Sequence, residues 1–215
     1  MLRLSLQLWL AAGLFAVGYV GSLPLSSSAS QPQSCHLLSN TQETPCFDLL
    51  NKTEHYQIRE YHGNLYWISA VSQSKDWNTA VGEGFKHNFG YISGQNAESK
   101  KIPMTAPVLA SRSTRGVFVD FFLPTEFYPP PAPTSDEVKL FQVRHRLRYA
   151  VMEFGGFAHE TKFQTKLQEL AERLKADGVQ TGPMSSAVLA QYNSPFKLFW
   201  RHNEVWLLIL NEPPE

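Results

Sequence analysis

The sequence has no surplus of charge of either sign. Its 215 residues contain 19 Lys and Arg residues and 19 Asp and Glu residues, so the formal net charge is zero at pH 7. A protein that neutralises nucleic-acid phosphates, or adsorbs to an anionic membrane by charge alone, needs an excess of basic side chains. The composition therefore argues against nucleic acid as a partner.

The sequence also lacks the short motifs of common enzymes. It contains no nucleophile elbow, P-loop, dinucleotide-binding fingerprint or His-Glu-x-x-His zinc motif. None of its seven histidines is spaced with another histidine like a metal site. These absences do not exclude an enzyme, but they indicate no particular reaction.

Cysteine is scarce, since Cys35 and Cys46 are the two cysteines of the chain. In an oxidising compartment an isolated pair most simply forms one disulfide. Neither cysteine has a second cysteine or a spaced histidine pair with which to build a zinc site. We expect a disulfide that fastens an N-terminal segment, residues 30–54, to the domain that follows.

Long apolar runs are confined to the N-terminus. One positive charge at Arg3 precedes an apolar run over residues 4–20, and small and polar residues follow. This layout predicts a secretory signal peptide over residues 1–22, with cleavage as late as residue 29. The alternative is an uncleaved membrane anchor, but at about 1.5 Å per residue the run is shorter than the roughly 30 Å hydrocarbon core. We therefore expect a secreted, extracellular protein with no stable membrane insertion after signal cleavage.

A glycosylation motif follows the cysteine pair. Asn51, Lys52 and Thr53 form an N-glycosylation acceptor. The motif is short and requires that Asn51 lie on the surface. It agrees with secretion and makes Asn51 a candidate glycosylation site.

The rest of the chain repeats itself. Residues 103–110, PMTAPVLA, resemble residues 183–190, PMSSAVLA, which begin 80 residues later. Around them both halves are typical of two strands, an amphipathic helix, an extended segment leading into a strand, and a final strand. We therefore predict an α+β fold built from an internally duplicated unit, with repeats at about 55–124 and 139–211. A proline-rich connector at 129–133 separates the repeats. The most strand-like segments are 66–71, 117–122, 149–154 and 205–210.

The two expected helices differ in their glycine content. In the second half, Thr161 and Gln164 form a capping box and Gly178 supplies the stop. In the first half, Asp76 can cap a helix that ends at Gly94. This first helix also contains Gly82, Gly84 and Gly90. Each glycine costs about 1 kcal/mol relative to alanine, which indicates that either a packed strand or a ligand approaches the helix closely.

Two prolines shape residues 101–108, KIPMTAPV. Proline lacks a backbone N–H and favours extended geometry in the residue before it, which excludes a helix interior or a central strand. We expect an extended segment that leads into a strand at 108–110, with Met104 and Val108 packed against the core.

A cleft between the first helix and the sheet is the default ligand site of such a fold. Aromatic side chains that could line it are Trp77, Phe85, Phe89, Phe196, Phe199 and Trp200. Core packing is the competing explanation for most of them. Lys197 either pairs with a ligand carboxylate at the rim or is simply solvated.

Three segments together carry a family resemblance: residues 101–108, KIPMTAPV; residues 192–195, YNSP; and residues 203–206, NEVW. In this order they resemble the SOUL haem-binding protein family, over about residues 56–210. The resemblance implies a twisted β-barrel with two flanking helices. It also implies a hydrophobic groove that binds haem or another tetrapyrrole non-covalently, in a protein that is not an enzyme.

The resemblance further implies site residues. Some relatives have a proposed histidine iron ligand in the segment matching residues 56–61, where this chain has Glu60, with His62 two residues later. His62 is therefore the candidate iron ligand. Other relatives hold haem through apolar contact with the first helix and basic side chains near the propionates. The candidates in this chain are His62, Val81, Phe85, Lys86, Phe89 and Lys197.

Two rival functions fit the same sequence. The duplicated unit is similar to bacterial effector-binding domains, some of which are hydrolases with a buried carboxylate. Glu204 is the candidate for that role, which a raised pKa in a closed pocket would support. The second rival is an extracellular interaction module without a small ligand, favoured if the protein's own side chains fill the groove.

Overall fold

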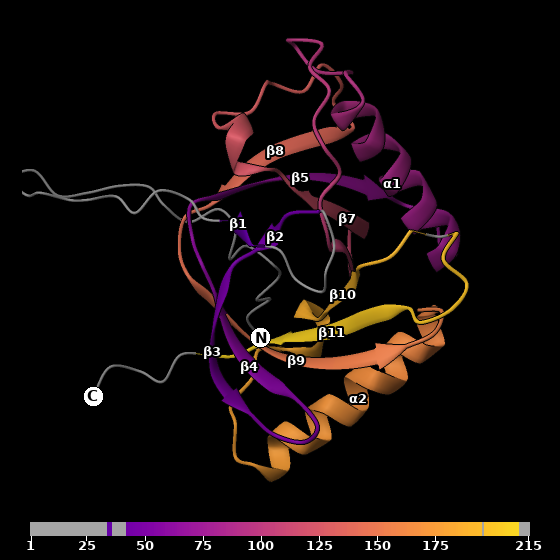
Figure 1. Cartoon of the computed structure of the whole chain (residues 1–215). Coiled ribbons are helices and arrows are strands. Elements are labelled where there is room, and N and C mark those ends of the chain that lie inside the picture. The colour runs from indigo at the N-terminus through magenta and orange to yellow at the C-terminus, as the bar shows by residue number, and fades with distance from the viewer. Residues whose placement is uncertain (1–33, 36–41, 195, 211–215) are drawn as a thin grey trace, which may run out of the picture. The chain divides into compact units, whose positions relative to one another are not determined.

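A computed structural model describes residues 34–35, 42–194 and 196–210 of the chain (Figure 1). The chain divides into residues 1–31 and residues 32–215. The expected signal peptide lies outside the described residues. No helix within the described ranges is long and apolar enough to cross a membrane.

The described residues form eleven strands, two α-helices and two short 3-10 helices. In chain order these are β1 (Ser34–Cys35), β2 (Thr44–Pro45), β3 (Phe47–Lys52), β4 (Gln57–Tyr61), β5 (Leu65–Ser72), α1 (Trp77–Ile92), β6 (Val108–Ser113), β7 (Gly116–Phe122), η1 (Thr125–Phe127), β8 (Val138–Val143), β9 (Leu147–Gly155), α2 (Glu160–Ala176), η2 (Met184–Ser186), β10 (Val188–Gln191) and β11 (His202–Leu208). The order strand, strand, helix, strand, strand occurs twice, as β4–β5–α1–β6–β7 and β8–β9–α2–β10–β11. The predicted order of elements is confirmed, although the last strand begins earlier than expected, at His202.

Nine strands form one antiparallel sheet in the order β3-β4-β9-β11-β10-β6-β7-β5-β8, and β1 pairs with β2 separately. From β4 to β8 this order is symmetric about the pair β10 and β6, because each strand of one repeat has its counterpart at the mirrored position. The two segments that resemble each other in sequence therefore meet at the centre of the sheet. Leu189 pairs with Ala110, and Gln191 pairs with Val108. The predicted internal duplication is confirmed.

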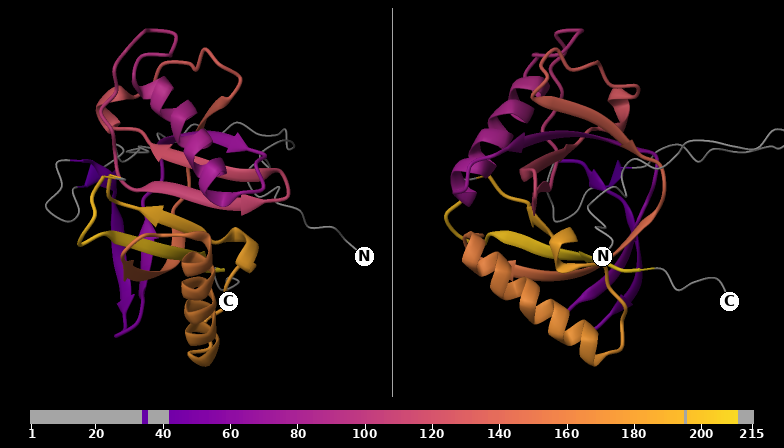
Figure 2. Two further views of the ribbon diagram at one scale, coloured as in Figure 1. Left: turned by 90° about the vertical axis from the view of Figure 1, so that its right-hand side faces the viewer. Right: turned by 180° about the vertical axis from the view of Figure 1, so that it is seen from behind.

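The two repeats exchange their first strands. β4 of the first repeat pairs with β9 of the second, and β8 of the second repeat pairs with β5 of the first. Neither repeat completes its part of the sheet alone, so both belong to one continuous structure. The sheet curls into a distorted half-barrel with both helices on its outer side, α1 against β5 and β7, and α2 against β9 and β11 (Figures 1 and 2).

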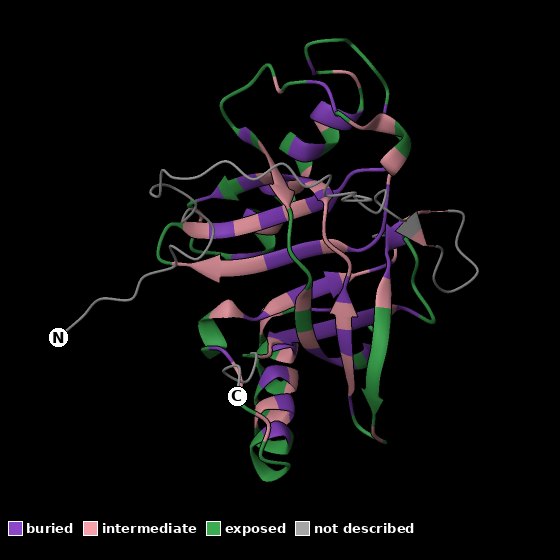
Figure 3. Ribbon diagram, turned by 90° about the vertical axis from the view of Figure 1, so that its left-hand side faces the viewer, coloured by how far each residue is buried: buried purple, intermediate pink, exposed green. Residues whose placement is uncertain are grey.

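The two faces of the sheet have different roles, because side chains along a strand alternate between them. Val205 and Leu207 of β11 belong to the apolar core beneath α2. Glu204 and Trp206 point to the opposite, concave face, where Trp206 joins a second apolar cluster. Buried and partly exposed positions alternate along several strands in Figure 3.

The ends of α1 follow the prediction, whereas the start of α2 does not. Asp76 accepts a hydrogen bond from the backbone N–H of Thr79 (2.8 Å), and Gly94 follows the helix with φ of 116°. The predicted capping box of Thr161 and Gln164 is wrong, because α2 begins at Glu160. Thr161 thus lies inside the first turn, and no side chain of the described residues caps the helix. Glu160 instead places a carboxylate in the first turn, where the helix dipole favours negative charge.

The glycines of α1 have separate explanations. A Cβ atom at Gly84 would lie 2.6 Å from Val119 of β7, so a packed strand accounts for this glycine. At Gly82, no heavy atom of the described residues lies within 4 Å of the corresponding position. At Gly90 the near atom is the flexible end of Gln95, at 2.5 Å. Gly82 therefore leaves an open surface on the helix.

The predicted disulfide joins Cys35 and Cys46, whose Cα atoms are 5.1 Å apart. The carbonyl of Cys46 accepts a hydrogen bond from the backbone N–H of His62 (2.9 Å), which ties the bridged segment to the main sheet. Asn51 lies exposed on β3, at the edge of this sheet. The position meets the steric requirement for a glycan, and glycosylation there stays a prediction.

Candidate functional site

The outer face of α1 carries an apolar strip, defined here by Gly82, Phe85 and Phe89. The rings of Phe85 and Phe89 stack with centroids 5.7 Å apart and an interplanar angle of 13°. Phe85 is half-buried because its ring also packs on Phe121 of β7, at 5.2 Å, whereas Phe89 is 48% exposed. Val81 is half-buried next to Gly82 and packs against two separate apolar clusters of the core. The strip is thus flat at Gly82 and aromatic along its remaining length.

A hollow of about 370 Å³ adjoins the C-terminal end of the strip. Its lining residues are Phe89, Ile92, Ser93, Lys101, Ile102 and Met104. One wall is therefore the last turn of α1, and the other is the start of the KIPMTAPV segment. The backbone N–H of Ile102 donates to the carbonyl of Ile92 (2.8 Å), which holds the two walls together. The volume falls at the lower end of the roughly 300–1,000 Å³ typical of ligand pockets.

Lys101 and Met104 belong to this hollow, although the sequence did not assign them to a site. The KIPMTAPV segment is extended before β6, as predicted, and Thr105 anchors it by donating to the carbonyl of Phe122 (2.5 Å). Met104 and Val108 are half-buried and pack against the core, as expected, and Met104 also lines the hollow. The fully buried positions of the segment include Ile102 and Thr105. The signal in the sequence was the proline pair, which keeps this segment out of both the helix and the sheet ladder.

The basic candidates lie on different elements. Lys86 is exposed on α1, between Phe85 and Phe89 in the sequence. Lys101 is exposed at the hollow. Lys197 is exposed on the connection between β10 and β11, where its backbone N–H donates to the carbonyl of Ser194 (3.0 Å). The helix thus brings Val81, Phe85, Lys86 and Phe89 together, while Lys197 belongs to another part of the fold.

His62 follows β4 and lies beside β3. Its Nε2 atom is 3.3 Å from Oδ1 of Asp48, and its backbone N–H donates to Cys46. The two groups are within ion-pair distance, but Nε2 makes no hydrogen bond among the described residues. The role of His62 as an iron ligand stays a prediction, and its neighbours Asp48 and Cys46 lie on and just before β3 rather than on α1.

The aromatic cleft expected from the sequence is divided among three places. Phe85 and Phe89 form the strip on α1. Trp77 is 3% exposed and stacks on Phe163 of α2 at 5.7 Å, so it belongs to the core. The other members of the predicted set, Phe196, Phe199 and Trp200, are exposed on the β10–β11 connection.

Comparison with known proteins places this geometry in a family. Residues 42–208 match the family model described as SOUL heme-binding protein. The chain belongs to this family. Heme-binding protein 2 from Homo sapiens is 37% identical over 168 residues, which cover 74% of this chain and 80% of that protein. Heme-binding protein 1 from Sus scrofa is 27% identical over 161 residues, which cover 71% of this chain and 83% of that protein.

The SOUL resemblance seen in the sequence is therefore confirmed, together with the distorted barrel and two helices that it implied. Among solved structures, a hydrolase from Listeria innocua superposes with a TM-score of 0.44 at 10% identity, covering 75% of this chain and 94% of that one. A likeness of this degree indicates nothing about activity.

Glu204, the hydrolase candidate in this SOUL-family chain, is 1% exposed on the concave face and fully hydrogen-bonded. Its Oε1 atom contacts Arg59 (2.9 Å) and the His202 ring (3.0 Å). Its Oε2 atom accepts from the Tyr192 hydroxyl (2.8 Å) and the Trp206 indole N–H (2.7 Å). Each carboxylate oxygen thus has two partners from the protein itself.

The pKa of Glu204 moves in the direction opposite to the one a hydrolase role needs. Burial by itself raises this pKa, but the hydrogen bond from His202 and the positive charge of Arg59 hold it below its ordinary value. The carboxylate is therefore kept charged. It has neither the raised pKa of a proton donor nor a free lone pair with which to bind a substrate proton.

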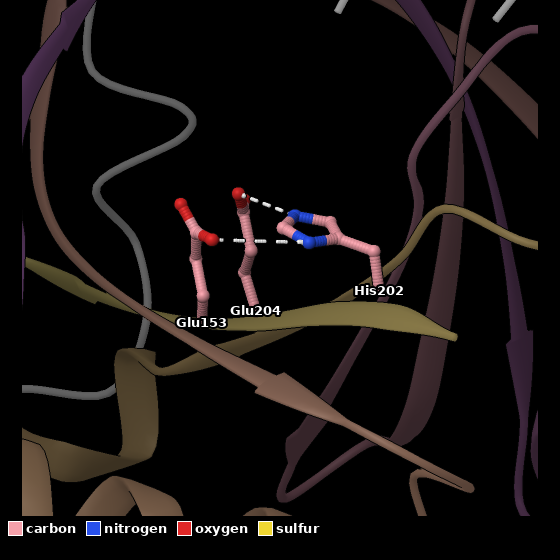
Figure 4. A group of neighbouring side chains, drawn as sticks. All are labelled: Glu153, His202 and Glu204. Atoms are coloured by element: carbon pink, nitrogen blue, oxygen red, sulfur yellow. Dashed lines mark hydrogen bonds and ion pairs between the residues drawn. The ribbon is translucent and has the colours of Figure 1, made fainter. Parts of the chain in front are cut away.

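Glu153, His202 and Glu204 approach one another closely enough to suggest a metal site (Figure 4). His202 Nδ1 lies 3.9 Å from Glu153, and its Nε2 lies 3.0 Å from Glu204. The Arg59 guanidinium contacts the same two carboxylates, at 3.3 and 2.9 Å. A permanent cation already neutralises the group, so this cluster is an ion-pair network rather than a built metal site.

Proposed function

We propose that this SOUL-family protein binds haem or a related tetrapyrrole non-covalently against the outer face of α1, without catalysing a reaction, and that it does so outside the cell. The observation that carries the proposal is the stacked pair Phe85 and Phe89, which leads into a hollow lined by apolar side chains. The family's relatives are named heme-binding proteins.

The strip and the hollow suit a flat apolar ring with charged edges. Phe89 offers an exposed aromatic face to a macrocycle, and Gly82 offers a surface without a side chain. The hollow accepts an edge of the ring against Ile102 and Met104. Lys101 stands where it can pair with a propionate, with Lys86 as a second cation on the helix.

Apolar contact is the main source of affinity in this proposal. When bound, haem supplies an iron centre and a conjugated ring. Met104 lines the hollow beside the edge of the ring, where its flexible side chain adds apolar contact. His62, the ligand predicted from the sequence, lies beside β3 rather than beside the strip on α1, so we assign it a smaller role.

Export from the cell rests on three observations of the chain. The residue 4–20 run is typical of a signal peptide. The Cys35–Cys46 disulfide is of a kind that persists in oxidising compartments. Asn51 is exposed, as a glycan requires. Detection of the protein in the medium of expressing cells tests secretion. A glycosidase should reduce the mass of the secreted wild type and leave the mass of Asn51→Gln unchanged.

A haemin titration followed by the Soret band tests the site. We expect a saturable one-to-one shift that Phe89→Ser weakens at least about tenfold, because one large apolar contact is lost. Lys101→Ala should weaken binding a few-fold and reduce its salt dependence. Met104→Leu keeps the apolar volume at the ring edge, so it should bind haemin with similar affinity and an unchanged Soret position.

Two controls make the titration decisive. His87 is exposed on α1 about 200° around the helix from both phenylalanines, so His87→Ala should bind haemin like the wild type. Leu49→Ser removes an exposed apolar side chain from β3 and should also be neutral. Equal affinity of wild type and Phe89→Ser would place the ligand elsewhere. The absence of any saturable shift would favour the interaction-module rival.

A further inference from the structure

The connection between β10 and β11 presents four large apolar side chains to solvent within five residues. Their exposed fractions are 89% for Phe196, 63% for Leu198, 74% for Phe199 and 93% for Trp200, and the remaining residue is Lys197. We call residues 196–200 the aromatic loop. It belongs to the yellow segment at the outer edge of the barrel in Figures 1 and 2. Such a concentration of exposed apolar surface marks an interaction site.

The aromatic loop is held in a defined shape by Arg201. This arginine is 7% exposed, and its guanidinium donates to the carbonyl oxygens of Ser194 (2.9 Å), Lys197 (2.7 Å) and Asn193 (3.4 Å). Asn193 in turn accepts from the backbone N–H of His202 through its side chain (2.6 Å). Several backbone polar groups at the base of the loop are thus satisfied internally. That lowers the cost of moving the loop into an apolar environment.

The backbone at Trp200 also points to a function. Its φ is +54°, in the left-handed region that is unfavourable for a bulky residue. The side chain gains no burial in return, since it is 93% exposed. A strained residue that displays a large apolar side chain is the kind of outlier from which a binding role is inferred.

A second segment extends the same surface. Phe157, on the connection between β9 and α2, is 44% exposed. Its ring centroid lies 4.9 Å from the guanidinium carbon of Arg201. The arginine that shapes the aromatic loop therefore also joins it to a fifth apolar side chain.

We propose that the aromatic loop docks the protein reversibly on a lipid bilayer, with its four apolar side chains in the interfacial layer. Tryptophan, phenylalanine and leucine beside a lysine are the composition that membrane interfaces favour. Exposed fractions of 63–93% mean that each side chain makes few contacts with the rest of the protein. Lipid chains are fluid and can surround each side chain separately. A protein partner would need a groove shaped to the whole loop.

This docking differs from insertion of a spanning segment, because it needs only side chains. The chain has no net positive charge with which to adsorb to anionic lipid. Burial of the apolar side chains therefore supplies the affinity, and neutral phosphatidylcholine should be sufficient as a target. The inference does not depend on the haem site, since the loop and the strip on α1 are different elements.

Vesicle flotation of the protein purified from the medium of expressing cells, after signal cleavage, tests the proposal. We expect the wild type to float with phosphatidylcholine vesicles, with little change on adding salt or phosphatidylserine. Phe199→Ser combined with Trp200→Ser should lower the partition coefficient at least about tenfold. Leu49→Ser, which removes a 52% exposed leucine from β3, should leave it unchanged. Unfolding curves of the variants should overlay the wild type, because none of these side chains is in the core.

Tryptophan emission gives an independent signal. Trp67, Trp77 and Trp206 are buried, and Trp9 lies in the predicted signal peptide, so for the secreted protein a blue shift on adding vesicles reports mainly on Trp200. Trp200→Phe should retain flotation and lose the shift. The proposal is overturned if the wild type does not float, or if the double variant floats equally well. It is also overturned if the wild type self-associates and the double variant does not, since the loop would then be an interface between two copies.

Discussion

Gly84 of α1 lies against Val119 of β7, so closely that a Cβ atom on the glycine would be 2.6 Å from the Val119 Cγ2 atom. The helix can approach the sheet at this point only because the residue has no side chain. Two residues earlier, Gly82 faces open space. One glycine therefore sets the packing of α1, and the other leaves the proposed ligand surface uncovered.

This contrast predicts opposite effects of the same substitution. Gly82→Ala should raise the free energy of unfolding by up to about 1 kcal/mol, because alanine favours the helix and meets no neighbour. Gly84→Ala should lower it by about 1–3 kcal/mol, since the added methyl group displaces Val119 or the helix. Urea denaturation of both variants checks the pair. A stabilised Gly84→Ala would show that α1 can move away from β7 without cost.

Removal of the Arg59 charge should destabilise the protein in a pH-dependent way. Glu204 has a folded-state pKa below its ordinary value, so its network contributes fully above that value and is lost as pH falls through the folded-state pKa. Arg59→Met removes the permanent positive charge beside the buried Glu204 carboxylate and should cost about 3–5 kcal/mol near neutral pH. The deficit should shrink toward pH 4, because protonation of Glu204 then relieves it. Unfolding at the two pH values measures this.

The matched control for that experiment is the double variant Arg59→Met with Glu204→Gln. It removes both charges and should recover part of the lost stability at neutral pH. If the single variant were as stable as the wild type at neutral pH, the ion pair between Arg59 and Glu204 would contribute nothing to the free energy of unfolding.

Asp120 on β7 should limit stability at neutral pH. Burial raises its pKa to about 6, although a hydrogen bond with Ser69 opposes the shift, and its Oδ1 atom has no partner among the described residues. The folded state thus binds the proton more tightly, so stability falls as pH rises from about 4 to 6 and stays lower above. Asp120→Asn should gain about 1–3 kcal/mol near pH 8 and nothing near pH 4.

Comparison with Asp136→Asn isolates the effect of burial at Asp120. The Asp136 side chain is fully exposed, so its substitution should change the unfolding free energy little at either pH. The same gain at both pH values in Asp120→Asn would contradict a titration and indicate a packing effect.

Loss of the disulfide should lower stability by about 2–3 kcal/mol. The bridge spans 11 residues, and its removal returns chain entropy to the unfolded state. The double variant Cys35→Ala with Cys46→Ala should therefore melt at a lower temperature than the wild type. A reductant should lower the wild-type melting temperature and leave the variant unchanged. If the reductant lowered the melting temperatures of both proteins equally, its effect would not come from this disulfide.

The fold was largely predictable because it rests on local patterns. Apolar periodicity and caps located α1, the proline pair located the extended segment before β6, and the repeated PMTAPVLA motif indicated the duplication. The start of α2 was mispredicted because Thr161 and Gln164 have the spacing of a capping box but lie inside the helix, which begins at Glu160. Local signals of this kind compete within one turn, and tertiary contacts choose between them.

The candidate site was predictable only in part. Val81, Phe85 and Phe89 share a helix face, so their spacing predicted their proximity. Lys101 and Met104 join them because the segment after α1 folds back onto its last turn. The aromatic loop was expected to line a cleft, yet its side chains face solvent, since aromatic composition alone does not distinguish a pocket from a protrusion.

The sequence by itself determined which elements form, that they occur twice, and which family the chain resembles, because helix periodicity, strand alternation, caps and prolines all act over a few residues. Tertiary structure alone decided that the two repeats exchange their first strands, that Arg59 meets Glu204 across the concave face, and that Met104 lines a hollow. These relationships join residues far apart in the chain. Their free energy comes from burial and pairing in the folded state, which no local pattern records.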